Sequence, residues 1–201
     1  MRFAPASLLL LACLALGGAA QSEEAPRTRI RGTILSLTGE TLDVATRGGE
    51  RVQVHVGPAP RVVALAAGSL ADVRPGSYVG TAAVPQPDGK LRALELQVFP
   101  ESMRGVGEGT RPWDVAPESS MTNGTVGSVA GTSGRDITIA YSGGEKTVAV
   151  PEQAPVVVYE PGTPGLLTPG AHVFIMATRA PDGTLASDRV TVGKDGLVPP
   201  M

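Results

Sequence analysis

The sequence predicts an all-β protein made of two repeated units. Three observations support this prediction. Apolar and polar residues alternate with a period of two in short stretches, as in Val52, Val54 and Val56. Glycine and proline are frequent, at 26 and 18 of 201 residues, which is typical of short strands joined by tight turns. A Pro-Asp-Gly turn followed by leucine occurs twice, at 87–91 and at 181–185.

The two halves of the chain match block by block, which indicates an internal duplication with a unit of about 70 residues. The matching blocks, in chain order, are RGTILSLTG with NGTVGSVAG, TLDVATRGGE with DITIAYSGGE, APRVVAL with APVVVYE, RPGSYV with TPGAHV, and the two Pro-Asp-Gly turns. The predicted organisation is a signal peptide at 1–20, a first barrel repeat at 27–99, a linker at 100–121, a second barrel repeat at 122–194 and a tail at 195–201.

Each unit contains three strands, an irregular link and a final hairpin. The strands follow from period-two alternation, and the link follows from the prolines and small residues that interrupt this alternation. In the first unit the expected elements are strands over Arg29–Leu37, through Leu42 and Val44, and through Val52–Val56, a link with one helical turn near Ser69–Val73, and strands over Val79–Val84 and Leu91–Val98.

This order of elements is that of an OB-type barrel. Closing five short strands into a barrel removes the exposed edges that an open sheet would leave. The prediction is therefore two tandem small OB-like five-stranded barrels, and the alternative is a single ten-stranded β-sandwich. Valine, leucine and isoleucine must fill the core, because aromatic residues form only 3% of the chain.

The linker at 100–121 is rich in glycine, proline and serine and holds the only tryptophan, Trp113. An indole exposed on a mobile linker would waste apolar area, so we expect part of the linker to dock on a barrel through Trp113. The stretch GVGEG at 105–109 is not expected to bind phosphate, because Pro112 and Pro117 follow it in place of a helix.

The first twenty residues have the layout of a secretory signal. Arg2 precedes an apolar run at Leu8–Leu16, and small residues precede a cut at Gln21. The run is too short to span a bilayer, and no later segment approaches the required length. Cys13 lies in a lipoprotein-like LLAC stretch, but cleavage there would truncate the apolar run, so lipidation is not expected. We expect a periplasmic or secreted protein with no transmembrane segment and no disulfide.

The sequence contains no recognisable catalytic or metal-binding pattern. The two histidines, His55 and His172, occupy different places in their repeats, so no ligand cluster is expected. Asp88 and Asp182 are better explained as turn residues than as calcium ligands. No nucleophile-elbow spacing is present. We therefore expect no enzyme activity, no cofactor and no metal.

The net charge of −2 gives a surface poorly suited to phosphate backbones, so no nucleic-acid partner is expected. The tyrosines do not recur as a repeated aromatic platform, and Tyr78, Tyr141 and Tyr159 are expected at core edges or rims.

The signal, the duplicated unit, the Pro-Asp-Gly turns, the linker PESMRGVGEGTRPWD and the tail VGKDGLVPPM together resemble a family of exported bacterial proteins of unknown function. Relatives in that family are sometimes labelled metal ABC transporter permeases. The permease label conflicts with the lack of an apolar span after the signal. The resemblance implies a periplasmic address and an OB-like unit, and it supplies no catalytic residues.

The sequence thus predicts an exported, non-enzymatic binding or interaction module of the bacterial envelope, with a protein or small-molecule partner. Clefts between domains commonly form ligand sites, so the site is expected where the barrels and the linker meet. Arg111, Trp113 and Asp114 are the candidate contacts, as a charge pair around an indole. Two alternatives are a periplasmic accessory protein of metal transport and a hydrolase whose site is not local in sequence.

Overall fold

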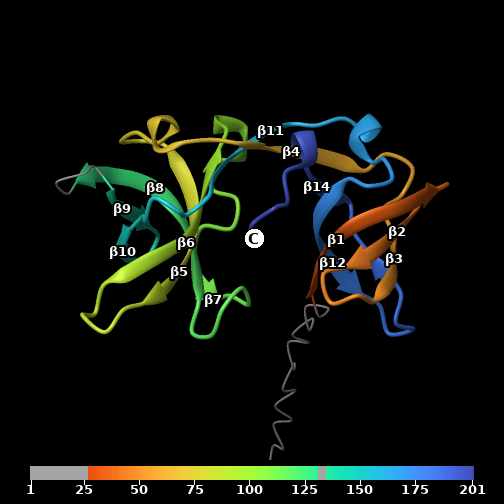
Figure 1. The fold of residues 1–201 in the computed structure, drawn as a ribbon, viewed down its shortest axis with the longest axis horizontal. Coiled ribbons are helices and arrows are strands. Elements are labelled where there is room, and N and C mark those ends of the chain that lie inside the picture. The colour runs from red at the N-terminus through yellow and green to blue at the C-terminus, as the bar shows by residue number, and fades with distance from the viewer. Residues whose placement is uncertain (1–26, 131–134) are drawn as a thin grey trace, which may run out of the picture.

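The computed structural model describes residues 27–130 and 135–201 (Figure 1). The predicted signal peptide at 1–20, including Cys13, lies outside the described residues. The regular structure of the described part consists of strands and four single-turn 3-10 helices, which confirms the all-β class.

Ten of the strands form two barrels, which we name barrel A and barrel B. Barrel A consists of β1 (Arg27–Thr38), β2 (Thr41–Thr46), β3 (Arg51–His55), β12 (His172–Arg179) and β13 (Leu185–Ala186). Barrel B consists of β5 (Tyr78–Pro85), β6 (Leu91–Phe99), β8 (Ser120–Ala130), β9 (Asp136–Tyr141) and β10 (Gly144–Ala149). The remaining elements are β4 (Arg61–Ala67), β7 (Gly109–Pro112), β11 (Val156–Pro161), β14 (Arg189–Gly193), η1 (Leu70–Asp72), η2 (Glu101–Met103), η3 (Pro164–Leu166) and η4 (Lys194–Gly196).

Strand pairing closes both barrels in the same order. Barrel A closes through β1, β2, β3, β13, β12 and back to β1. Barrel B closes through β8, β9, β10, β6, β5 and back to β8. In each ring one pair is parallel, β3–β13 in barrel A and β10–β6 in barrel B, and the others are antiparallel. This arrangement is consistent with the predicted OB-like barrels, and the single ten-stranded sandwich is not formed.

The two repeats exchange their final hairpins. Strands β1 to β3 of the first repeat pair with β12 and β13 of the second repeat. Strands β8 to β10 of the second repeat pair with β5 and β6 of the first. The structure therefore differs from the expectation that 27–99 and 122–194 each close a barrel of their own, because every barrel combines strands from both segments.

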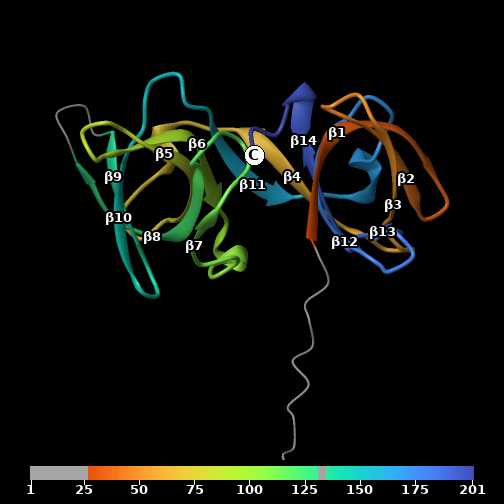
Figure 2. The same ribbon diagram turned by 90° about the horizontal axis from the view of Figure 1, so that it is seen from below.

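The exchange is made by β4 and β11, which run between the barrels as an antiparallel pair (Figures 1 and 2). Val62, near the start of β4, belongs to the core of barrel A, and Val73, just after η1, belongs to the core of barrel B. β11 runs the opposite way, since Val158 packs on the core of barrel B and Leu167 lies in the core of barrel A. The segment expected to be an irregular link is thus largely a crossover strand.

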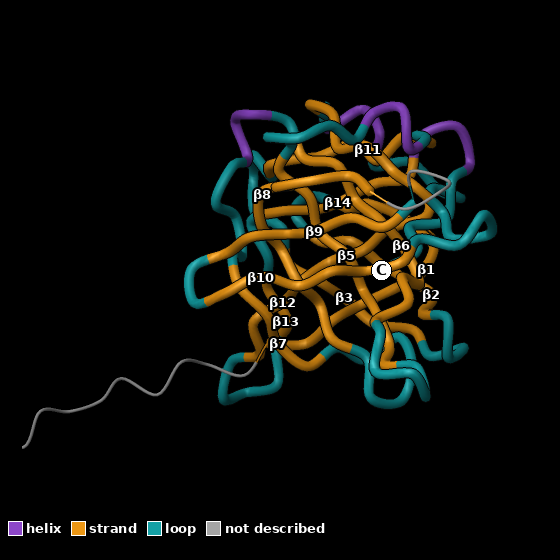
Figure 3. The backbone as a smooth tube through the Cα atoms, turned by 90° about the vertical axis from the view of Figure 1, so that its left-hand side faces the viewer, coloured by secondary structure: helices purple, strands orange, loops and turns teal. Residues whose placement is uncertain are grey.

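Each barrel has its own aliphatic core, as expected from the composition. Ile34, Leu42 and Ile175 are fully buried in barrel A, and Leu96 and Ile137 are fully buried in barrel B. A third cluster fills the joint between the barrels. It consists of Leu65, Tyr78, Phe99, Val157, Tyr159 and Met201. Figure 3 looks onto barrel B and shows the single-turn helices gathered at one edge of the molecule.

The aspartates of the two Pro-Asp-Gly turns make matching hydrogen bonds in the two repeats. The Asp88 carboxylate accepts a hydrogen bond from the backbone N–H of Lys90 at 3.1 Å, and Asp182 accepts one from Thr184 at 2.9 Å. The two aspartates therefore act as turn residues. The expected helical turn is η1, which Ser69 caps by accepting a hydrogen bond from the N–H of Ala71.

Gly32 and Gly124 occupy matching sites where the first strand of each repeat passes closest to its neighbour. A Cβ atom at Gly32 would lie 2.2 Å from the carbonyl oxygen of Ala45, and one at Gly124 would lie 2.3 Å from that of Ala140. A β-bulge follows in both strands. Because the conflicting atoms belong to the backbone, they cannot rotate away, and only glycine fits.

Replacement of Gly124 by alanine is expected to lower the free energy of unfolding by about 1–3 kcal/mol, the usual cost of overpacking. Urea unfolding followed by circular dichroism measures this change. Gly127, in the same strand, provides the matched control, since its nearest atom would be 3.9 Å from an added Cβ. Gly127→Ala is expected to change stability by less than about 0.5 kcal/mol. Equal effects of the two substitutions would contradict the steric explanation.

Candidate functional site

A cavity of about 650 Å³ lies between the two barrels. Strands β6 and β8 and the linker supply one wall, strands β1, β12 and β14 supply the other, and β11 and the C-terminal segment complete the lining. The lining residues are Gln97, Phe99, Met103, Val106, Gly107, Glu108, Arg111, Trp113, Met121 and Asn123 on the first wall, Arg27, Phe174, Met176, Thr178, Ser187, Asp188, Arg189 and Thr191 on the second, and Tyr159 and Met201.

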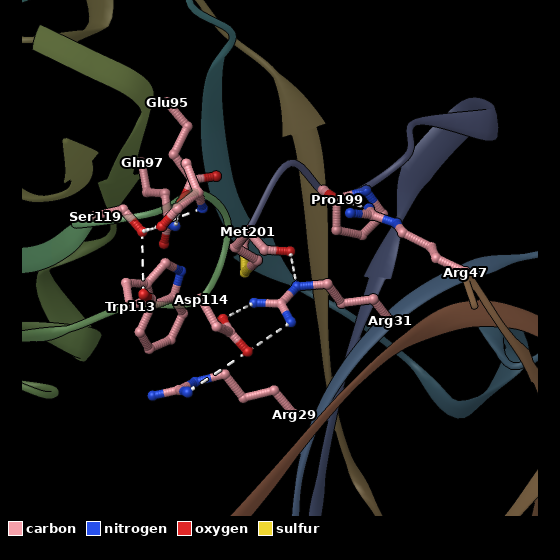
Figure 4. A network of polar contacts seen from close by, with 11 residues as sticks. Arg29, Arg31, Arg47, Glu95, Gln97, Trp113, Asp114, Ser119, Pro199 and Met201 are labelled. Carbon is pink, nitrogen blue, oxygen red and sulfur yellow. Dashed lines mark hydrogen bonds and ion pairs between the residues drawn. The ribbon is translucent and has the colours of Figure 1, made fainter. Parts of the chain in front are cut away.

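The linker is held at this joint by Trp113. Strand β7 pairs with β8, and the backbone N–H of Trp113 donates to the backbone carbonyl of Ser119 at 2.8 Å. The half-buried indole lies against Phe174 of barrel A, with ring centroids 6.4 Å apart. The Arg29 guanidinium lies 4.0 Å from the centroid of the indole (Figure 4). This arrangement agrees with the expectation that the linker docks through its tryptophan.

Asp114 ties the linker to β1. Its two carboxylate oxygens accept hydrogen bonds from the Arg31 guanidinium at 2.6 and 3.1 Å, and Arg29 lies 3.6 Å away (Figure 4). The hydrogen bonds from Arg31 lower the pKa of Asp114, although burial partly opposes them. Asp114 does not line the cavity, and its partners are these two arginines rather than Arg111.

Arg111 lines the cavity beside the same indole, with its guanidinium 5.6 Å from the ring centroid. One Nη donates to the carbonyl of Gly107 at 2.7 Å. Within 27–130 and 135–201, no carboxylate forms an ion pair with Arg111. Burial, and then repulsion from Arg29, lowers its pKa. Of the three candidate residues, Arg111 and Trp113 line the cavity. Asp114 lies outside it and pairs with Arg29 and Arg31.

The opposite wall carries Arg189, which also lacks a carboxylate partner among the described residues. The acids of the lining already have partners. Asp188 is ion-paired with Arg61, and Glu108 accepts the N–H of Ser142 at 2.8 Å. The cavity therefore presents Arg111 and Arg189, which form no ion pair with a carboxylate of the described residues.

The apolar part of the lining is rich in sulfur and aromatic rings. Apart from Met1, every methionine of the chain lies in it: Met103, Met121, Met176 and Met201. Phe99 stacks on Tyr159 with centroids 4.6 Å apart. Tyr78 and Tyr159 are buried at the joint, as their assignment to core edges anticipated. Sequence reasoning missed the methionines, because they are scattered along the chain and only the exchanged barrels bring them together.

A buried polar network joins two lining residues, Gln97 and Tyr159, to Glu95; Figure 4 shows Glu95 and Gln97. Tyr159 donates from its hydroxyl to Gln97 at 3.1 Å, and the Gln97 amide donates to the Glu95 carboxyl at 2.8 Å. The other carboxyl oxygen of Glu95 has no hydrogen-bond partner among residues 27–130 and 135–201. Burial raises the pKa of Glu95 to about 7, although the bond from Gln97 and the charges of Arg31 and Arg47 act in the opposite direction.

The C-terminal segment closes one side of this network. Arg31 Nε donates to the main-chain oxygen of Met201 at 2.6 Å, and Arg47 donates to that of Pro199. The Met201 side chain is buried against the hydroxyl of Tyr159, at 3.3 Å from sulfur to oxygen. The predicted tail at 195–201 is thus packed into the joint between the barrels.

Neither His55 nor His172 lines the cavity. His55 is 3.4 Å from a carboxylate oxygen of Glu40, and His172 contacts the hydroxyl of Thr33 at 3.0 Å. In the described ranges, histidine, cysteine, aspartate and glutamate residues do not gather in groups of three or more that could hold a metal ion. Within the same ranges, the structure contains no helix with the length and apolar character needed to cross a membrane.

Comparison with models of known protein families, with curated proteins and with solved structures finds no match for this chain. The functional interpretation therefore depends on the cavity and its lining.

Proposed function

We propose that the protein is an exported, non-enzymatic binding module of the bacterial envelope and that the cavity between its barrels is the ligand site. The observation that carries this proposal is the cavity itself. Its volume of about 650 Å³ falls within the range of small-molecule sites, which are mostly apolar with a few polar groups that fix orientation. Aromatic rings and methionines form such a lining together with Arg111 and Arg189, whose guanidinium groups pair with no carboxylate of the described residues.

Two buried polar atoms of the lining residues support a ligand at this place. The indole Nε1 of Trp113 and the amide Oδ1 of Asn123 have no hydrogen-bond partner among the described residues. Leaving a buried donor or acceptor unpaired costs about 1–3 kcal/mol, so such groups usually have a partner. A bound molecule could supply one donor and one acceptor to them.

N-phenyl-1-naphthylamine, an uncharged fluorescent dye of suitable size, tests the location of the site. We expect saturable binding of one dye per chain, with energy transfer from Trp113, the only tryptophan. Thr178 lies exposed at the cavity wall, so Thr178→Phe should narrow the cavity and weaken dye binding about tenfold.

Thr147 provides the matched control, because it is exposed on β10 and does not line the cavity. Thr147→Phe is expected to leave dye binding unchanged. Lack of saturable binding, or equal weakening by the two substitutions, would remove the cavity as the ligand site.

A further inference from the structure

We propose that the ligand of this cavity is a small organic anion, one acidic group carried on an apolar body. This inference rests on the proposed function, because it names the ligand class for the same site. It follows from three features of the lining: Arg111 and Arg189, which have no carboxylate partner among the described residues, the unpartnered indole N–H of Trp113, and an apolar surface too large for a bare inorganic anion.

The charges favour an anion. Arg111 and Arg189 stand on opposite walls, and neither is paired with a carboxylate of the described residues. Asp188 and Glu108, the acids of the lining, are already bound to Arg61 and to a backbone N–H. Removing a guanidinium from water without a counter-charge is costly, and an acidic group on a ligand would form charge-assisted hydrogen bonds with it.

The surroundings of Trp113 point the same way. Arg29 lies 4.0 Å from the indole centroid and Arg111 lies 5.6 Å from it, so two cations share one ring. The indole Nε1 is a donor that has no hydrogen-bond partner in the part of the chain that the structure describes. In Figure 4 this nitrogen lies on the side of the ring toward Gln97 and Met201, both of which line the cavity. The unpaired indole N–H and the positive charge of Arg111 together favour an acceptor that carries negative charge.

The size and chemistry of the remaining lining require an apolar body. Methionine side chains adapt to the shape of a ligand and make favourable contacts with aromatic rings. The four methionines, Phe99 and Phe174 all contribute apolar side chains to the lining. An inorganic sulfate or phosphate would fill only a small part of about 650 Å³ and would leave this surface without contacts. The geometry therefore excludes a site built for a bare anion.

A matched pair of dyes tests the ligand class on the full-length protein. 8-Anilinonaphthalene-1-sulfonate is N-phenyl-1-naphthylamine with an added sulfonate, so the two differ in the acidic group alone. We expect the sulfonate to bind at least about tenfold more tightly. Arg111→Gln should reduce the affinity for the sulfonate dye by a much larger factor than it changes the affinity for the neutral dye. Arg111→Lys, which keeps the charge, should retain most of the affinity.

Two controls complete the experiment. Arg92 is exposed on β6 and does not line the cavity, so Arg92→Gln should bind both dyes as the unmodified protein does. Sodium sulfate, which has the charge without the apolar body, should displace the anionic dye no more than sodium chloride of equal ionic strength.

The possible results separate the two proposals. Equal affinities for the two dyes, or equal weakening of both by Arg111→Gln, would overturn the anionic ligand class and leave the binding site intact. Specific displacement by sulfate would overturn the requirement for an apolar body. Failure of both dyes to bind would overturn the proposed function and this inference with it.

Discussion

A segment covering residues 27–99, produced alone, is expected not to fold as a monomer. Its strands β1 to β3 lack β12 and β13, and its hairpin β5–β6 lacks β8 to β10. Strands β1 to β3 and the hairpin β5–β6 would each be part of an open barrel, with the core side of each strand exposed to water. The loss is not a few kcal/mol but the whole cooperative structure, because both cores need strands from each repeat. Circular dichroism and the dispersion of amide NMR signals measure the outcome.

Mixing the two halves provides the positive control. Residues 27–117 and residues 118–201, made separately, should combine into one complex that regains the β spectrum and the Trp113 emission of the intact chain. Any folded population of 27–99 alone should be a dimer, since two copies could exchange hairpins as the two repeats do. A folded monomer of 27–99 in size-exclusion chromatography would contradict the exchange of hairpins.

Strand positions could be predicted because they depend on local patterns. Alternation such as that of Val52, Val54 and Val56 and the repeated Pro-Asp-Gly turns are properties of neighbouring residues. The partners of each strand could not be predicted, because the two repeats present the same pattern and either hairpin could complete either barrel. The segment that carries the hairpin of the first repeat to the other barrel begins with β4. Pro58 and Pro60, just before it, suggested a loop, but pairing with β11 and β14 makes this segment a strand.

In the candidate site too, features that depend on neighbouring residues could be predicted, and features that depend on distant segments could not. Arg111 and Trp113 could be placed at the joint because a linker with one large indole is likewise a local feature. The roles of Asp114 and the methionines depend on contacts between segments far apart in the sequence, such as Arg31 with Asp114. Glu95 illustrates the limit most clearly. In an alternating strand it would be placed on the solvent face, but the exchanged barrels cover that face and leave Glu95 only 1% exposed.

This burial leads to the second large effect, an unusual dependence of stability on pH. Below about pH 4.5 the Glu95 carboxyl is protonated in both the folded and the unfolded chain. Its pKa in the folded protein is about 7. Between these values the unfolded chain releases the proton and the folded chain keeps it. The free energy of unfolding should therefore fall as pH rises, by about 3 kcal/mol in total, and the contribution should stay constant above about pH 7.

Glu95→Gln removes the titrating group and keeps an oxygen that can accept the hydrogen bond from Gln97. Between pH 5 and pH 8 the free energy of unfolding of the unmodified protein should fall by about 2.5 kcal/mol relative to that of Glu95→Gln. Urea unfolding at pH 5, 6, 7 and 8 measures both curves. The difference between them cancels the contributions of other titrating groups that the substitution does not touch.

Glu145, which is exposed on β10, supplies the matched control. The stability of Glu145→Gln should depend on pH in the same way as that of the unmodified protein. Arg31 and Arg47 attract the ionised carboxylate of Glu95, and the same two side chains hold the main-chain oxygens of Met201 and Pro199. Burial outweighs this attraction and keeps the pKa of Glu95 above its ordinary value. Parallel stability curves for Glu95→Gln and the unmodified protein would show that Glu95 holds its proton equally in the folded and the unfolded state, which would contradict this explanation.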